Sequence, residues 1–413
     1  MAELLFLLVG GRVVREKWWI VGLVGSVWLL GGVFFFTDAL IEEIRIHPAW
    51  FAVPLLLDAI VSLTAALGVV GGRRALRFVK AAVLILVSVL ILDHPWRSDM
   101  IVGFLVGFLL VIDASWRAAS AVLVRYPRWR RSVAAAALEF VIGLWSFVPW
   151  PTNWEGEVGV DVGTLMIVTA LGLLTLALRI RRLPAGVPVA RLVNEGWPAD
   201  DGSAEAVAAP DRRAGTVTVH VWTPTGAMVS LRRGIARYVA ALDENGVIST
   251  GHAALEAGPA IYISHYPAVE IERDQAQFTK TLRATAENDV PGRFQPSYTV
   301  ESAEWCPSTR RVELHGLDLA ALEAFWSLYR RDSTYNLTNR NCSSAVAKAL
   351  DAAVEGVFAE RSRSLGFMLR LALLPELWAA GVMRRRAALM AWTPGLVLDY
   401  ARALAGVLEL PAR

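Results

Sequence analysis

The chain has 413 residues, of which 55% are hydrophobic and 19% charged, and its mean hydropathy is +0.45. These values lie well outside the average for soluble globular proteins and argue against a wholly soluble chain. Long apolar runs fill residues 18–180, whereas residues 182–361 have the composition of an ordinary globular domain. The sequence therefore predicts a membrane part followed by a water-soluble part.

Six segments in the first part are long and apolar enough, or nearly so, to cross a bilayer, which takes about 20 residues of helix. They are residues 18–36, 50–70, 76–92, 100–124, 133–148 and 162–180. The earlier apolar stretch 4–9 is too short to span and has no basic region ahead of it, so it does not resemble a signal peptide. We predict a six-span α-helical bundle over residues 1–183.

Charged residues alternate between the loops of this bundle. Short cytoplasmic loops retain Lys and Arg, and Arg and Lys cluster before the first segment and after the second, fourth and sixth. The opposite loops are mainly acidic, with Arg45 and Arg97 as exceptions. This pattern predicts a multi-pass protein of the bacterial inner membrane with its N-terminus and C-terminal domain in the cytoplasm. It also explains the net charge of +3 without a nucleic-acid partner.

The membrane part contains an internal repeat. The runs "LLLDAIVSL" around Asp58 and "LLVIDASWR" around Asp113 lie 55 positions apart, and "HPAW" and "HPWR" mark two of the outer turns. We interpret the bundle as three helical hairpins. In length, topology and repeats it resembles the HdeD-like six-helix membrane family associated with bacterial acid resistance. That resemblance implies a compact bundle without a known catalytic residue.

Asp58, Asp113 and Glu139 fall inside or near predicted spans, where ionisable side chains are candidates for a transport role. The alternative is that they lie near the membrane interface or pair with Arg77 or Arg117. The sequence favours this alternative.

The soluble part begins with a Pro-, Gly- and Ala-rich linker, residues 184–214, and continues as an α+β domain over residues 215–360. Alternating β-branched and aromatic residues predict four strands, and apolar periodicity predicts two helices. The strands are at 216–223, 251–257, 260–266 and 310–316, and the helices at 318–331 and 342–354.

Cys342 is the candidate nucleophile of this domain. Asn341 occupies the N-cap position, so the thiol lies in the first turn of a helix, whose N–H groups and dipole lower a thiol pKa. The strand residue His252 is the candidate base, and His265 on the following strand is the candidate orienting group. A shift of one residue in register would bring Ser264 or Tyr266 to that place instead.

The motif "GHAALEAGPAIYISHYPA" and the later motif "YNLTNRNCSSAVAKAL", whose cysteine lies 90 residues after His252, resemble the permuted papain-like fold of the NlpC/P60 superfamily, in particular its lecithin retinol acyltransferase-like branch. The resemblance implies a nucleophile at Cys342, a base at His252 and an orienting residue at His265. Ser343 and Ser344 depart from the bulkier residues usual after the cysteine, and residues 270–306 have no counterpart. These departures concern the substrate class more than the fold.

The remaining candidates have structural interpretations. Cys306 precedes Pro307 in a predicted turn, and His220 and His315 flank strands at solvated or core-edge positions. The chain has no zinc-binding or phosphate-binding motif, and we predict chemistry without metal or cofactor. The two cysteines form no disulfide framework, which suits a reducing compartment.

The last segment, residues 361–413, is again apolar but interrupted by arginines and prolines, which predicts amphipathic helices on the inner leaflet or over the bundle, or a seventh span. The sequence as a whole predicts a membrane-anchored thiol hydrolase or acyltransferase. Its partners would be membrane lipids and a lipid-linked, acylated or peptide substrate. The alternative is a nonenzymatic membrane stress protein whose papain-like domain binds a partner.

Overall fold

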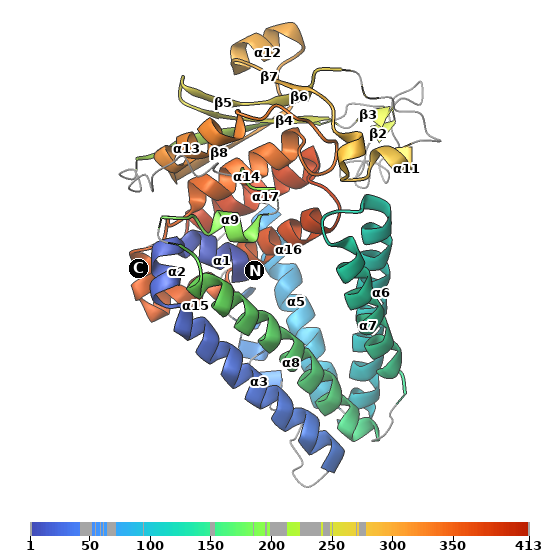
Figure 1. The fold of residues 1–413 in the computed structure, drawn as a ribbon. Helices are drawn as coiled ribbons and strands as arrows, with labels where there is room; N and C mark the ends of the chain where they lie inside the picture. Colours follow the sequence, from blue (N-terminus) through green and yellow to red (C-terminus); the bar gives the residue numbers. More distant parts are fainter. Residues whose placement is uncertain are drawn as a thin grey trace. The chain divides into compact units, whose positions relative to one another are not determined.

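The structure is a computed structural model of the chain. It describes residues 2–41, 52–53, 55–57, 59–60, 62–63, 72–93, 95–148, 153–184, 186–194, 196–198, 213–223, 241–242, 248–249, 251–269, 271 and 278–411. The chain divides into two compact units. One contains residues 14–119 and 130–183, and the other contains residues 1–13, 120–129 and 184–413. Figure 1 shows the elements of both units.

The first unit is helical. Its long helices are α3 (Trp18–Ile41), α5 (Gly72–Asp93), α6 (Pro95–Val124), α7 (Trp129–Trp145) and α8 (Trp154–Arg181). They coincide with the first, third, fourth, fifth and sixth predicted spans, whereas most of the second, 50–70, lies outside the described residues. Among the described residues, three helices are long and apolar enough to cross a membrane, or four if the bent pair at 365–389 is one span. The prediction of helices is confirmed; the number of six stays a prediction.

Small residues let these helices pack closely. A Cβ on Gly32 of α3 would lie 2.9 Å from the carbonyl oxygen of Gly163 in α8, and one on Gly107 of α6 would lie 2.9 Å from that of Gly143 in α7. Glycine is therefore required at both crossings, as in membrane helices that associate without a hydrophobic driving force. The first predicted span thus packs against the sixth.

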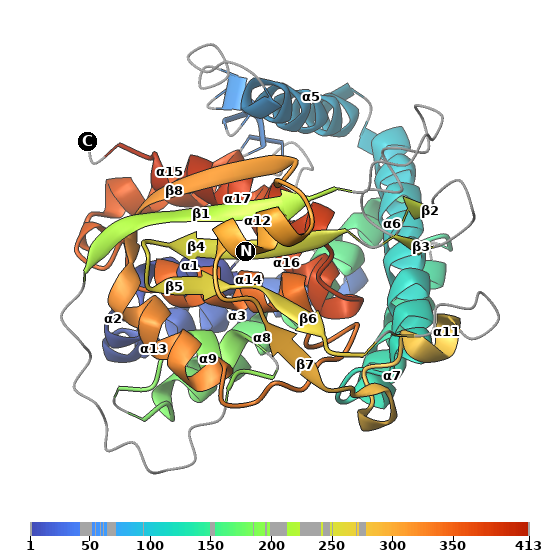
Figure 2. The same cartoon turned by 90° about the horizontal axis from the view of Figure 1, so that it is seen from above.

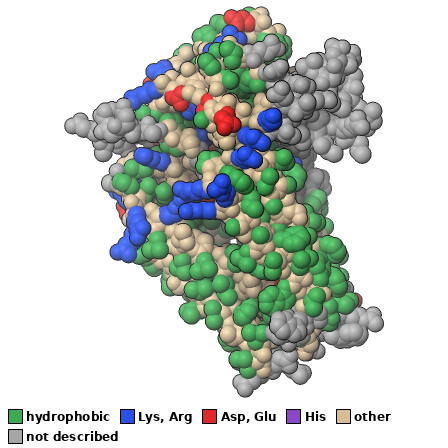
Figure 3. Space-filling view, turned by 45° about the vertical axis from the view of Figure 1, so that its right-hand side comes forward, with side chains coloured by type: hydrophobic (Ala, Val, Ile, Leu, Met, Phe, Trp, Pro, Cys, Tyr) green, Lys and Arg blue, Asp and Glu red, His purple; other side chains and the backbone are tan. Residues whose placement is uncertain are grey.

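The outward surface of the long helices is apolar. Figure 3 shows hydrophobic side chains covering the visible face of these helices, and Leu109, Leu138 and Val168 are each more than half exposed. A surface of this kind is unusual in a soluble protein and suits contact with lipid.

Two of the acidic candidates in this unit are paired. Arg117 of α6 contacts the Asp113 carboxylate at 2.9 Å and the Glu139 carboxylate of α7 at 3.1 Å. This is the pairing that the sequence favoured over a transport role. Asp58 lies outside the described residues.

The second unit is an α+β domain built on an antiparallel sheet. Its four strands lie in the order β5 (Ile261–Ile263), β4 (His252–Ala257), β1 (Ala214–Trp222) and β8 (Arg310–Asp318). Two-stranded pairs join β6 (His265–Pro267) to β7 (Gly292–Phe294), and β2 (Ala241–Leu242) to β3 (Ile248–Ser249). The four predicted strand regions and the α+β class are confirmed.

Helices cover both faces of this sheet (Figures 1 and 2). The helices α14 (Cys342–Val354) and α17 (Pro394–Leu408) pack on one face, and the short helix α12 (Tyr298–Glu304) lies over the other. The helix α13 (Leu319–Tyr329) packs against α14, with Asp318 as its N-cap. Every residue of α14 is buried, so this helix forms the centre of the domain.

The C-terminal helices are part of the same unit, so the expected domain boundary at residue 360 is not seen. Leu396, Val397 and Leu404 of α17 are buried against strands β8 and β1. The helix α16 (Pro375–Leu389) packs on α17, whereas α15 (Leu365–Leu373) leaves Leu365 and Leu369 more than half exposed. The expectation of membrane-surface helices throughout 361–413 therefore does not fit α17, whose apolar face covers the sheet.

The N-terminal helix α1 (Ala2–Val9) also belongs to this unit. Leu4, Leu7 and Leu8 are fully buried, and the carbonyl oxygens of Leu7 and Leu8 accept backbone hydrogen bonds from Gly356 and Phe358 at 2.8 Å. The apolar stretch that is too short to span is thus a core helix.

Part of the predicted linker contacts the end of α14. The helix α9 (Ala190–Val193) begins at the Glu355 carboxylate, which accepts the N–H groups of Val189 at 2.8 Å and Ala190 at 3.0 Å. Residues 199–212 of the linker lie outside the described part of the chain.

Candidate active site

Cys342 is the first residue of α14, as the sequence predicts. The Asn341 side chain accepts the Ser344 N–H at 2.7 Å, and the Ser344 hydroxyl accepts the Asn341 N–H at 2.8 Å, which completes a capping box. This cap fixes the start of the helix. Its two hydrogen bonds do not use the backbone N–H groups of Cys342 and Ser343. They are among the first N–H groups of a helix, which have no partner within it.

The structure brings His252 to this thiol. His252 is the first residue of β4, and its imidazole lies close enough to the Cys342 side chain for each group to shift the pKa of the other. The sulfur lies 3.7 Å from the Ser343 hydroxyl. Cys342 and His252 are 7% and 3% exposed, so the pair is shielded from bulk water.

A carboxylate that the sequence analysis missed stands beside the imidazole. Glu301 of α12 is 1% exposed, and its Oε1 lies 3.2 Å from His252 Nε2. The same carboxylate accepts hydrogen bonds from the hydroxyls of Tyr266, at 2.6 Å, and of Tyr262. Cys342, His252 and Glu301 thus follow one another in the order thiol, imidazole and carboxylate.

His265, the expected orienting group, has other partners. Its Nδ1 lies 3.1 Å from the Tyr329 hydroxyl, and its Nε2 lies 3.2 Å from the Ser333 carbonyl oxygen. Ser264 and Tyr266 adjoin His252 instead, with Ser264 Oγ 2.8 Å from His252 Nε2 and the Tyr266 ring stacked on the imidazole at 4.0 Å. This arrangement is the alternative in which the register is shifted by one residue. It arises because successive side chains of an extended segment point to opposite sides.

The electrostatics of the three groups are mutually supporting. Burial alone raises the pKa of the Cys342 thiol, but the charge and hydrogen bond of His252 outweigh it, so the net pKa is lowered. Burial lowers the pKa of His252, yet the nearby Cys342 and then Glu301 raise it to about 9. Burial raises the pKa of Glu301, and His252 with the two tyrosine hydroxyls lowers it to about 2. The neighbouring charges thus favour the ionised form of each of the three groups.

Aromatic side chains surround the imidazole. Trp222 of β1 lies 5.4 Å from the His252 ring centroid and stacks on Trp305 at 5.6 Å, and its indole N–H donates to the Cys306 carbonyl oxygen at 2.8 Å. Cys306 itself packs beside Trp222, in keeping with the structural role expected for it.

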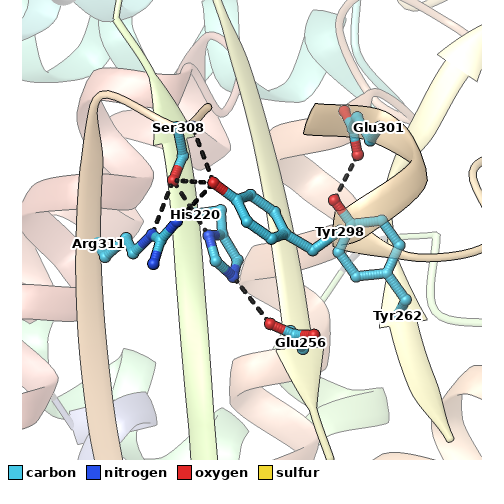
Figure 4. Close-up of polar contacts among 7 residues, drawn as sticks. All are labelled: His220, Glu256, Tyr262, Tyr298, Glu301, Ser308 and Arg311. Atoms are coloured by element: carbon cyan, nitrogen blue, oxygen red, sulfur yellow. Dashed lines mark hydrogen bonds and ion pairs between the residues drawn. The ribbon is translucent and has the colours of Figure 1, made fainter. Parts of the chain in front are cut away.

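A second polar cluster lies on the same face of the sheet (Figure 4). His220 of β1 is 2% exposed, with Nε2 3.2 Å from the Glu256 carboxylate and Nδ1 3.1 Å from the Ser308 hydroxyl. The Tyr298 ring of α12 stacks on this imidazole at 4.0 Å. His220 is therefore a buried residue and not a solvated one, because α12 covers it. His315 is exposed and lies 3.0 Å from the Thr216 hydroxyl.

The signals for the missed residues are weak in the sequence. Glu301 lies in "YTVESAE", within the span 270–306 that has no counterpart in the resembled family. Its place beside His252 arises from packing between α12 and strands distant in sequence, and no local spacing encodes that.

Comparison with known proteins gives one family. A family model described as the IcsB middle domain matches residues 271–410, about a third of the chain, which include Glu301 and Cys342 but not His252. No curated protein and no solved structure matches the chain. The expected HdeD-like resemblance of the membrane part finds no support in these comparisons. The α+β unit is thus similar to the IcsB middle domain over its C-terminal part.

Proposed function

We propose that the chain is a membrane-anchored cysteine acyltransferase that moves a fatty acyl group through a thioester on Cys342. The observation that carries the proposal is the buried array of Cys342, His252 and Glu301, in which each group stabilises the charged form of its neighbour. Such arrays activate a nucleophile that is weak at its ordinary pKa. The match to the IcsB middle domain supports acyl transfer over peptide hydrolysis, because IcsB is an acyltransferase related to the papain-like fold.

The first half-reaction acylates the enzyme. The Cys342 thiolate attacks the carbonyl carbon of an acyl thioester, and the N–H groups of Cys342 and Ser343 at the start of α14 stabilise the oxyanion. The tetrahedral intermediate collapses as the bond to the donor sulfur breaks. The departing thiolate takes the proton of the His252 imidazolium, which leaves an acyl thioester on Cys342 and a neutral imidazole.

The second half-reaction transfers the acyl group. The neutral His252 accepts the proton of an incoming amine or alcohol as that group attacks the thioester carbonyl. The bond to Cys342 breaks, the cysteine leaves as a thiolate, and the imidazolium beside Glu301 is restored. Glu301 stabilises that cation in the low-dielectric interior and holds Nε2, so that Nδ1 serves the reacting atoms.

The long apolar helices support a location at the membrane, where acyl donors and lipid-modified acceptors collect. Together with the alternation of basic loops, they favour a catalytic unit at the cytoplasmic face of a bacterial inner membrane. The acceptor would be an amine or alcohol of a protein or lipid at that surface.

The proposal is tested by trapping the acyl-enzyme. The full-length chain in detergent micelles is incubated with an alkyne-bearing palmitoyl-CoA, and the labelled peptide is identified by mass spectrometry with and without hydroxylamine. We expect a hydroxylamine-sensitive label on Cys342 that is lost in Cys342→Ala and kept in Cys306→Ala. A label that survives Cys342→Ala, or no label on a folded chain, would support the nonenzymatic partner-binding alternative.

A further inference from the structure

The helix α12 carries Glu301 to the site, yet it is only seven residues long. Isolated helices of this length are marginal in water, so the position of α12 depends on what its side chains contact. Tyr298 and Glu301 are three residues apart and lie on one face of the helix, toward the sheet, and Trp305, which follows the helix, stacks on Trp222 of β1. The carboxylate is thus flanked by two aromatic anchors.

Tyr298 makes the most extensive of these anchoring contacts (Figure 4). Its ring stacks on the His220 imidazole with 4.0 Å between centroids and 18° between planes. Its hydroxyl accepts hydrogen bonds from Arg311 Nη2 at 2.6 Å and from the Ser308 N–H at 3.1 Å. The Arg311 guanidinium also lies 4.8 Å from the centre of the tyrosine ring.

These partners are themselves fixed to the sheet. His220 lies on the inner strand β1, and its two ring nitrogens contact the Glu256 carboxylate and the Ser308 hydroxyl. Arg311 lies on β8 and contacts the same hydroxyl through Nε at 3.2 Å. The tyrosine therefore docks onto β1 and β8, whereas Glu301 reaches β4, β5 and β6 through His252, Tyr262 and Tyr266.

We infer that Tyr298, held by His220 and Arg311, is a positioning residue that keeps the Glu301 carboxylate against the His252 imidazole. The inference rests on the proposed function, since it concerns the ionisation of the same thiol. One helical turn separates residues 298 and 301, so a rotation or lift of α12 at Tyr298 displaces the carboxylate. A displacement of about 1 Å weakens the interaction between the carboxylate and the imidazole, because charge interactions are strong in a buried site and depend closely on distance and orientation.

The test measures the pH dependence of Cys342 alkylation by iodoacetamide in the full-length chain, with the modified peptide quantified by mass spectrometry. In Tyr298→Ala we expect the midpoint of thiolate formation to rise by about one pH unit, which is tenfold less thiolate on the acid side. In Tyr298→Phe, which keeps the stack on His220 and loses the hydroxyl, we expect a smaller rise. Arg311→Gln should resemble Tyr298→Phe.

The matched control is Arg310→Gln, since Arg310 is exposed on the same strand and donates only to the backbone of Thr309 among the contacts described.

A double-variant cycle separates positioning from a general loosening of the fold. If Tyr298 acts through Glu301, then Tyr298→Ala adds no further shift in a Glu301→Gln background. Additive shifts, or an unchanged midpoint in Tyr298→Ala while Glu301→Gln raises it, would overturn the inference and leave the proposed function standing. If neither Glu301→Gln nor His252→Ala moves the midpoint, the proposed function itself fails. Near-ultraviolet circular dichroism of each variant establishes that the domain is folded.

Discussion

Glu301 is the residue on which the balance of charge in the site depends. Without a carboxylate, a buried imidazolium and thiolate would have only each other, and burial disfavours both charged forms. With Glu301, the imidazolium lies between two negative groups. The two tyrosine hydroxyls that donate to Glu301 keep its own charge stable in turn.

We predict that Glu301→Gln lowers acyl transfer by tenfold or more, because about one pKa unit of stabilisation of the His252 imidazolium is lost. The pKa of His252 should fall below its value of about 9. The alkaline limb of the pH profile of kcat/KM should therefore move to lower pH, and this profile is the measurement. An alkaline limb that stays in place would show that Glu301 does not contact the imidazole during turnover.

A second prediction concerns His265, whose imidazole is buried in the neutral form. Burial holds the pKa of His265 down at about 4, and its ring nitrogens contact the Tyr329 hydroxyl and the Ser333 carbonyl. A lowered pKa gives stability that is present above the unfolded value of 6.5 and is lost as the pH falls through about 4. The loss amounts to about 3 kcal/mol.

The measurement is the free energy of unfolding of the full-length chain between pH 7 and pH 4. His265→Gln should be less stable than the parent at pH 7 and should show a shallower decline toward pH 4. Equal slopes in the two proteins would contradict the buried, neutral histidine.

At the level of single residues, the sequence placed Cys342 at the start of its helix and His252 on a strand near it, and it named His265 as the third group, where the structure has Glu301. The N-cap at Asn341 and the strand at His252 are local patterns, which short-range spacing encodes. Ser264, which joins β5 to β6, and His265, the first residue of β6, are neighbours in an extended segment, so only the register decides which of them faces the imidazole. Glu301 arrives from a helix whose docking is set by tertiary contacts alone.

At the scale of elements, α14 organises the domain. Its first residue bears the thiol, its middle is buried on every side, and its last turn carries Asp351. The Asp351 carboxylate accepts a hydrogen bond from the Tyr400 hydroxyl of α17 at 2.6 Å and forms an ion pair with Arg384 of α16. Three helices are thus joined at one buried charge pair.

We predict that Arg384→Met destabilises the domain by about 3–5 kcal/mol, because it leaves Asp351 charged and buried without its cation. The control is Arg385→Met, an exposed neighbour on α16, which should change stability by less than about 0.5 kcal/mol. Denaturant unfolding followed by tryptophan fluorescence gives both values. Similar stabilities for the two variants would contradict a buried ion pair at Arg384.

The elements themselves were predicted where their pattern was local and strong. The helix at 342–354 and the strands around His252 and His220 follow from periodicity and capping. The role of α17 was not predicted, because an apolar helix that covers a sheet and one that faces lipid have similar composition. Packing partners decide between them, and they come from β8 and β1, about 80 to 180 residues earlier.

At the scale of the whole molecule, a unit of long apolar helices is joined in one chain to a buried thiol site. The helical unit has an apolar outer surface, and the α+β unit binds both the N-terminal helix α1 and the C-terminal helix α17 into its core. Residues 2–9 and 394–408 therefore fold with the α+β unit. This arrangement suits an enzyme whose substrate is presented at a bilayer surface.

We predict that the chain resists extraction from membranes by alkaline carbonate and is released by detergent. Green fluorescent protein fused after Arg413 should fluoresce, and alkaline phosphatase fused at the same place should be inactive, since the basic loops predict a cytoplasmic position for this end. The reverse pattern would place the catalytic unit on the other side of the membrane.

The central claim is that the Cys342 sulfur is held as a thiolate by the His252 imidazolium. Its most direct test is the rate of iodoacetamide alkylation of Cys342 as a function of pH in the parent chain and in His252→Ala, with Cys306 in the same molecule as the internal reference. We expect the rate at Cys342 to rise at a pH well below the ordinary thiol value of 9.0 in the parent, and His252→Ala to remove that advantage. A Cys342 that reacts no earlier than Cys306, or an unchanged profile in His252→Ala, would contradict the account.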